Sequence, residues 1–63
     1  MLLFLCVKNV VMDNRDIAFY EGKSYQFTMD KYGDIHYKNT SLAKFHSFSA
    51  SRWPEYFKYN GAL

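Results

Sequence analysis

The feature that most constrains this chain is the stretch from residue 19 to residue 39, FYEGKSYQFTMDKYGDIHYKN. Two segments in which polar and apolar residues alternate flank a loop, residues 30–34, that contains Gly33. A period of two is typical of a half-buried β-strand, because successive side chains point to opposite faces of a sheet. Glycine in such a loop suits the left-handed position of a bulged hairpin turn. The stretch therefore predicts an antiparallel β-hairpin.

The flanking segments are also rich in β-forming residues. Residues 2–12 form an apolar run that ends at a turn signal, and we expect one strand that is buried on both faces. Residues 17–20 predict a short strand. Residues 42–49 suit either a strand or a helical turn, and we favour a strand over residues 44–48. Pro54 predicts a short 3₁₀ turn near residues 53–56, and we expect residues 60–63 to fray.

This series of elements predicts a single all-β domain over residues 1–63. Four to five short antiparallel strands, with one helical turn near the C-terminal end, fit a small SH3-like barrel best. A truncated OB-like sheet is the alternative. Closure of a barrel protects the strand edges that an isolated meander would expose.

The aromatic content bears on both core and function. Six Phe, six Tyr and one Trp occur among 63 residues. A domain of this size buries only about 60% of its unfolded surface. The lone Cys6 cannot form an internal disulfide, so the rings, which can each bury roughly 150–250 Å², are the material of the core. We assign about two thirds of the rings to the core and expect the others to be exposed.

Charge and hydropathy limit the partners and the cellular location that we expect. The net charge is +2, and the basic residues are evenly spread among the acidic ones, which does not indicate a strong nucleic-acid surface. The apolar start, MLLFLCV, is too short to span a bilayer and has no small-residue cleavage site, so we expect a buried strand and no membrane association. One unpaired cysteine without an export signal suggests the cytoplasm.

The residues that could carry chemistry are few. His36 and His46 have no obvious partners, and Cys6 lies in an apolar run, as core cysteines do. The spacing of Cys and His fits no zinc motif, and no serine has a base in a recognisable order. Residues 22–24, Gly-Lys-Ser, lack the rest of a phosphate loop. We therefore expect no enzymatic activity, no metal and no cofactor.

Exposed aromatic and arginine side chains commonly provide most of the binding energy at protein interfaces. We therefore predict a protein-binding patch made of Trp53, Arg52, Tyr37, Tyr32, Tyr20 and Tyr56. Trp53 has two equally supported interpretations at this stage. It is either a surface anchor or a ring that closes one end of the barrel.

Two other modes of association follow from the same residues. A single-stranded nucleic acid could stack its bases on aromatic rings while lysines hold its phosphates; the candidates are Tyr25, Tyr37 and Phe45 with Lys23, Lys38 and Lys44. The apolar N-terminal strand could instead pair with its copy in a homodimer. A protein partner is the favoured of the three.

Five short motifs together resemble a pattern in small, uncharacterised SH3-like proteins of phages and prophages. They are CVKNV at residues 6–10, DIAF at 16–19, GKSY at 22–25, GDIHY at 33–37 and WPEYF at 53–57. Residues 1–3 and 41–51 depart from this pattern. The resemblance implies an SH3-like fold, a phage or mobile-element origin, and a role as inhibitor or modulator of a host protein. It carries over no catalytic residues.

Overall fold

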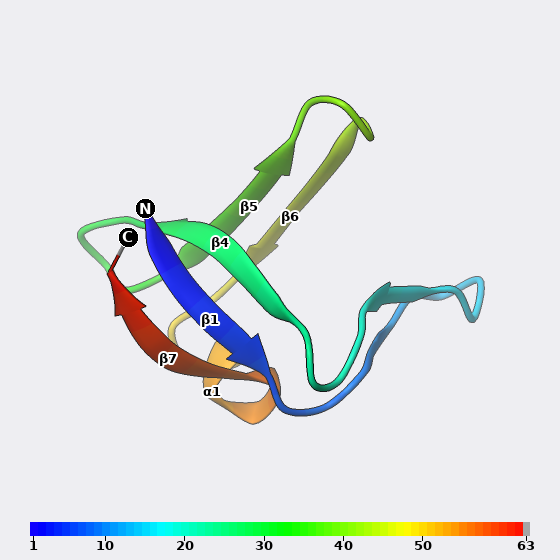
Figure 1. Ribbon diagram of the computed structural model, residues 1–63, viewed down its shortest axis with the longest axis horizontal. Helices are drawn as coiled ribbons and strands as arrows, with labels where there is room; N and C mark the ends of the chain where they lie inside the picture. The colour runs from blue at the N-terminus through cyan, green and yellow to red at the C-terminus, as the bar shows by residue number, and fades with distance from the viewer. Residues whose placement is uncertain (63) are drawn as a thin grey trace.

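The computed structural model describes residues 1–62, and the protein is mostly β (Figure 1). The elements in chain order are β1 (Leu2–Cys6), β2 (Val10–Val11), β3 (Ile17–Phe19), β4 (Ser24–Met29), β5 (Ile35–Asn39), β6 (Lys44–Phe48), α1 (Trp53–Tyr56) and β7 (Phe57–Ala62). No helix among these residues is long and apolar enough to cross a membrane.

Five strands form one antiparallel sheet in the order β6-β5-β4-β1-β7, and β2 and β3 form a separate antiparallel hairpin. β4 connects the two halves of the larger sheet, because residues 24–27 pair with β1 whereas Thr28 and Met29 pair with β5. Figure 1 shows the β5–β6 and β2–β3 hairpins as two arms that extend beyond β1 and β7. The sheet is open, with β6 and β7 as its edge strands.

The central hairpin matches the sequence prediction. β4 and β5 flank residues 30–34, and the Asp30 N–H donates to the Asp34 carbonyl at 3.0 Å. Gly33 has a φ of +85°, and a Cβ added there would lie 3.3 Å from the Cβ of Ala50. Glycine is therefore required both by the backbone conformation and by the close approach of the next loop. The predicted strand over residues 44–48 is also confirmed, as β6.

Three sequence predictions about local structure are wrong. Residues 2–12 are two strands, because β1 ends at Cys6 in the main sheet and residues 10–11 pair with β3 in a separate hairpin. The helical turn is closed by an i to i+4 bond from the Phe57 N–H to the Trp53 carbonyl, so it is an α turn rather than a 3₁₀ turn. Residues 60–62 do not fray, because they continue β7 and pair with β1; Leu63 lies outside the described residues.

β1 is a central strand with β4 on one side and β7 on the other. Both of its edges are therefore occupied. The proposed pairing of the N-terminal strand with its copy has no free edge to use, and a homodimer would need another surface.

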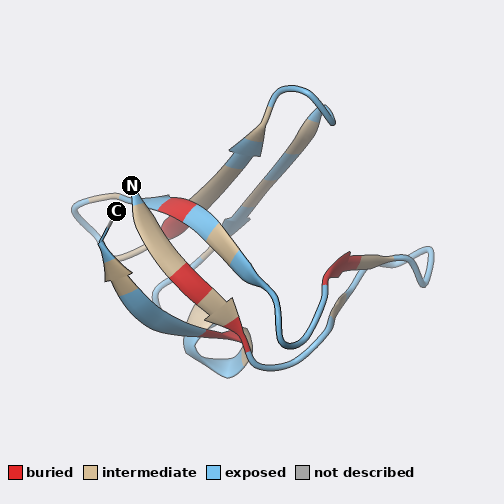
Figure 2. Cartoon of the chain, in the orientation of Figure 1, coloured by how far each residue is buried: buried red, intermediate tan, exposed pale blue. Residues whose placement is uncertain are grey.

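The core consists of seven buried residues: Phe4, Cys6, Ala18, Phe19, Phe27, Ile35 and Phe57 (Figure 2). Phe19 is its centre. The Phe19 ring packs against six other rings, those of Tyr25, Phe27, Tyr37, His46, Phe48 and Phe57, at centroid distances of 4.8–5.7 Å. Because Phe19 belongs to β3, this packing fixes the β2–β3 hairpin to the main sheet.

Most of the rings belong to the core, but several do not. Tyr20, Tyr32, Phe45 and Tyr59 remain 48%, 71%, 59% and 49% exposed. The expectation that the chain has more rings than its interior can hold is confirmed. The surface therefore carries aromatic side chains that the fold itself does not need to bury.

Candidate functional site

A groove lies between the β2–β3 hairpin on one side and the end of β6 and α1 on the other. Its volume is about 320 Å³, and it is lined by residues 10–11, 47–49, Arg52 and Tyr56. We call it the Arg52 groove. Val11 is 59% exposed at its wall, and the Tyr56 ring lies 5.5 Å from the Lys8 ammonium. The groove thus combines apolar side chains with the cationic Arg52.

A second groove of about 490 Å³ continues along the same strand. Its walls are Met12 and residues 16–18 of the hairpin, opposite residues 42–46. We call it the Phe45 groove. Leu42 is 70% exposed and Phe45 is 59% exposed. Side chains of this size that remain in water favour a partner that would cover them.

The two grooves follow one another along β6. Residues 44–46 line the Phe45 groove and residues 47–48 line the Arg52 groove, while the β2–β3 hairpin faces both. We call the pair of grooves the β6 trough. It exists because Phe19, Val10 and the Lys44 ammonium, which donates to the Ala18 carbonyl, hold the hairpin against the sheet without backbone pairing to β6.

A third groove lies elsewhere on the sheet. It measures about 290 Å³ and is lined by Met1, residues 24–26 and residues 37–39. It contains Tyr25, Tyr37 and Lys38, three residues of the nucleic-acid hypothesis. However, the Tyr25 and Tyr37 rings meet edge to face, with centroids 6.0 Å apart, and both pack on Phe19. Their faces are therefore partly used by the core.

The structure does not bring the six predicted binding residues into one patch. Arg52 and Tyr56 line the Arg52 groove, and Tyr37 lines the third groove. Tyr32 lies in the loop between β4 and β5, and Tyr20 follows β3; both are exposed. The Tyr20 ring lies 5.3 Å from the Lys23 ammonium. Only Arg52 and Tyr56 belong to the β6 trough.

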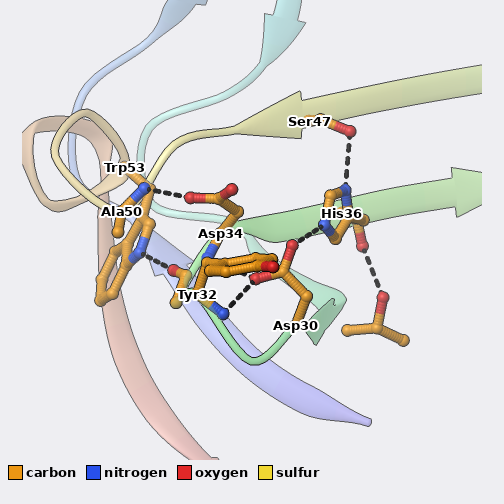
Figure 3. A network of polar contacts seen from close by, with 9 residues as sticks. Asp30, Tyr32, Asp34, His36, Ser47, Ala50 and Trp53 are labelled. Atoms are coloured by element: carbon orange, nitrogen blue, oxygen red, sulfur yellow. Dashed lines mark hydrogen bonds and ion pairs between the residues drawn. The ribbon is translucent and has the colours of Figure 1, made fainter.

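The contacts of Trp53 are those of a structural residue. Its ring meets Phe4 edge to face, with centroids 5.2 Å apart, and its Nε1–H donates to the Gly33 carbonyl at 2.9 Å (Figure 3). The ring is only partly exposed. It therefore ties α1 to the loop between β4 and β5 and closes that end of the core, which favours the second of its two interpretations.

Sequence reasoning missed a row of polar side chains that runs from the loop after β4 across β5 to β6. His36 Nε2 lies 2.9 Å from Asp30 Oδ2, and His36 Nδ1 lies 2.8 Å from Ser47 Oγ (Figure 3). Asp30 and His36 belong to the same hairpin, and the register that places His36 opposite Ser47 brings in the third residue from β6. The presence of His two residues after a hairpin loop that begins with Asp was the one available signal.

The same aspartate also holds the loop. Asp30 Oδ1 accepts hydrogen bonds from the backbone N–H groups of Tyr32 and Asp34, at 2.9 and 3.0 Å. Asp34 Oδ1 in turn accepts the Ala50 N–H at 2.8 Å. His36 lines none of the three grooves, so we interpret the Asp30–His36–Ser47 row as a brace for the loop rather than as a reaction centre.

The brace predicts an acid-dependent loss of stability. The hydrogen bond from His36 is the main cause that lowers the pKa of the Asp30 carboxyl below the usual aspartate range. In the unfolded chain the Asp30 carboxyl has the usual aspartate pKa near 3.9, so as the pH drops from about 5 the unfolded chain takes up the proton before the folded protein does. The free energy of unfolding therefore falls as the pH passes through about 3.9 toward the lower pKa of the folded state. Asp30→Asn should make this fall shallower in urea titrations at successive pH values. Asp13→Asn, which changes an exposed carboxylate in the hairpin turn, should leave it as steep; equal slopes in all three proteins would contradict the assignment.

Two other titratable groups support the core rather than chemistry. Burial raises the pKa of the Cys6 thiol, whose S–H donates to the Lys8 carbonyl at 3.0 Å. Burial, with a smaller contribution from the charge of Lys44, lowers the pKa of His46, whose ring packs on Phe19. Among residues 1–62, no three His, Cys, Asp or Glu side chains converge as metal ligands would.

Comparison with known proteins identifies no relative of this chain. No protein-family model matches the chain, and no curated protein or solved structure shows significant similarity to it. The class that fold and site define is therefore a small antiparallel β protein with a trough of mixed apolar and charged side chains along one edge strand.

Proposed function

We propose that the chain is a non-enzymatic protein-binding module and that the β6 trough is its binding surface. The observation that carries the proposal is the presence of exposed apolar side chains along one trough, with Val11 and Leu42 each more than half exposed and Arg52 at one end. Burial of such side chains, together with an arginine, is what provides energy at protein interfaces.

We also propose that the architecture is a variant of the SH3-like barrel. The supporting observations are the order β6-β5-β4-β1-β7, a long hairpin inserted between β1 and β4, and a helical turn before the last strand. In such an arrangement the inserted hairpin and the helical turn lie beside the same surface, and here both line the Arg52 groove.

The sequence resemblance to phage proteins suggests the kind of partner. On that basis we propose a host protein in the cytoplasm, with inhibition or modulation as the outcome of binding. A nucleic acid is disfavoured because Lys44 is engaged with the Ala18 carbonyl and the Phe19 ring, and because Asp16 lines the same trough.

The test is capture of partners from a host lysate by the immobilised chain, followed by mass spectrometry. Val11→Asp places a charge in the trough. We expect it to weaken binding of the captured partner by about tenfold or more, as loss of an interface anchor does. Met29→Asp is the matched control, because Met29 is exposed but lines none of the three grooves.

Both variants should keep the wild-type circular dichroism spectrum. Capture that persists in Val11→Asp would contradict the assigned surface. A single-stranded oligonucleotide that binds tightly at low salt and is released as salt rises, with a slope set by phosphate contacts, would favour the nucleic-acid alternative instead.

A further inference from the structure

The direction in which the unpaired backbone groups of β6 point follows from the hydrogen-bonding pattern of the β4–β5 hairpin. Asp30 and Asp34 are joined by a backbone hydrogen bond, so in the alternating pattern of an antiparallel pair the next hydrogen-bonded pair is Thr28 with His36. The backbone groups of His36 thus point to β4, and those of Tyr37 point to β6.

The register of the next pair then fixes β6. Tyr37 is opposite His46, and this is a hydrogen-bonded pair, as are Ile35 with Phe48 and Asn39 with Lys44. Phe45 and Ser47 are the residues between them. Their N–H and C=O groups therefore point away from β5, to the free edge of the sheet.

These outward groups have no partner in the described part of the chain. No backbone or side-chain hydrogen bond between residues 1 and 62 reaches the N–H or C=O of Phe45 or Ser47 from the free side. Natural edge strands are commonly protected by a lysine that stays in water. Here Lys44 does not protect the edge, because its ammonium lies 4.5 Å from the Phe19 centroid and donates to Ala18.

The other edge of the sheet differs. β7 contains Lys58, Asn60 and Gly61, of which Lys58 and Asn60 are exposed, and none of the three grooves lies along it. Of the two edge strands of the five-stranded sheet, as residues 1–62 describe it, β6 is the one that borders a trough. A strand laid against it would place alternate side chains into the trough, on the face shared by His46 and Phe48.

The trough also has opposite charges at its two ends. Arg52 lines the end near Phe48. Asp16 lines the other end together with Lys44, whose ammonium is directed to the Ala18 carbonyl and the Phe19 ring, so the Asp16 carboxylate is the charge available to a partner there. An antiparallel strand, which is the slightly more stable arrangement, would have its N-terminal end at Arg52 and its C-terminal end at Asp16. Charge complementarity then requires an acidic residue at its start and a basic residue at its end.

We propose that β6 accepts an extended segment of a partner protein by strand addition, with apolar residues at alternate positions, an acidic N-terminal end and a basic C-terminal end. This inference rests on the proposed protein-binding function and specifies its partner. The segment needs five to six residues, since β6 spans five residues, or about 17 Å. A second copy of the whole chain suits the site less well, because the β2–β3 hairpin forms a wall beside the edge.

The probe is the synthetic peptide acetyl-Glu-Val-Thr-Val-Thr-Val-Lys-amide, titrated into ¹⁵N-labelled protein. In the antiparallel arrangement its two threonines pair with Phe45 and Ser47, and its valines enter the trough. We expect saturable binding with a dissociation constant of about 1 mM or lower. Hydrogen exchange should slow at the Phe45 and Ser47 amides, whereas those of Lys44, His46 and Phe48 are already protected by β5 in the free protein.

N-methylated peptides make the test specific to the backbone. Methylation of the two threonine nitrogens removes the donors that face β6, and should weaken binding by at least about tenfold. Methylation of the central valine nitrogen removes a donor that faces away, and should leave binding unchanged. A peptide with Glu and Lys exchanged should bind more weakly than the original.

Variants of the protein provide the reciprocal test. Ser47→Pro removes the outward N–H and spares the ladder to β5, a position that edge strands tolerate. Both Ser47→Pro and Ser47→Ala lose the hydroxyl that contacts His36, but only Ser47→Pro loses the N–H. Ser47→Pro should abolish peptide binding, and Ser47→Ala should bind the peptide measurably. Thermal unfolding shows whether Ser47→Pro is folded, and the methylated peptides decide the matter if it is not.

Several results would overturn the inference. These are no binding of the probe, equal loss on methylation of either set of nitrogens, or unchanged exchange at Phe45 and Ser47. Spectral changes on peptide addition that are confined to Arg52 and Tyr56 would also overturn the inference, while leaving the proposed protein-binding function intact. Failure of the wild-type chain to capture any partner would instead count against the proposed function itself.

Discussion

Replacing Phe19 by alanine should remove a large part of the stability of the fold at 25 °C. The Phe19 side chain is fully buried and packs against six rings from β4, β5, β6 and β7. It is also the main contact that holds the β2–β3 hairpin to the sheet. Truncation removes its burial and opens a cavity where every strand of the sheet except β1 contributes an aromatic or imidazole ring.

The expected magnitude is large relative to the whole stability. Truncation of a buried phenylalanine costs about 3–5 kcal/mol. Domains are stable by about 0.05–0.15 kcal/mol per residue, which for 63 residues is roughly 3–9 kcal/mol. The free energy lost is therefore a large part of the stability of the fold, and all of it at the lower end of that range.

Circular dichroism and urea titration measure this effect. Phe45→Ala is the matched control, because the same ring is removed from a position that is 59% exposed. It should change the free energy of unfolding by no more than about 0.5 kcal/mol. If Phe19→Ala unfolds at the same urea concentration as Phe45→Ala, then Phe19 is not the centre of the core.

Replacing Trp53 by alanine should have the second-largest effect, and a pair of variants separates its causes. Trp53→Phe keeps a ring against Phe4 but removes the Nε1–H that donates to the Gly33 carbonyl. We expect it to cost about 1 kcal/mol, the usual net value of one hydrogen bond. Trp53→Ala also removes the ring, and we expect about 2–4 kcal/mol, because the side chain is only partly exposed.

Urea titration followed by circular dichroism measures both, since fluorescence of the only tryptophan is lost. Tyr32→Ala is the control, because Tyr32 belongs to the same region but is 71% exposed. A Trp53→Ala variant that is as stable as Tyr32→Ala would restore the interpretation of Trp53 as a free surface anchor.

The elements that are local in sequence could be predicted. The alternation in residues 24–29 and 35–39 and the glycine at position 33 depend on neighbouring residues, and the structure has β4, the left-handed turn and β5 there. The strand over residues 44–48 is confirmed for the same reason. The prediction that some rings stay exposed needed only the number of rings and the length of the chain.

The predicted binding patch was less successful, because side-chain type does not specify position. Arg52 and Tyr56 share a groove, whereas Tyr20 and Tyr32 lie at separate loops. The apolar residues of the trough, Val11 and Leu42, were not among the predicted binding residues. Nothing in their sequence context distinguishes them from ordinary core residues.

The sequence by itself determined the two strands of the central hairpin and where that hairpin turns, since both follow from alternation and from the backbone freedom of one glycine. Only the tertiary structure decided that the chain leaves the sheet after Cys6, that β1 lies between β4 and β7, and that Asp30, His36 and Ser47 meet. The physical reason is that these features depend on pairing between segments distant in sequence. Such pairing is settled by the burial of Phe19 and its neighbours as a group.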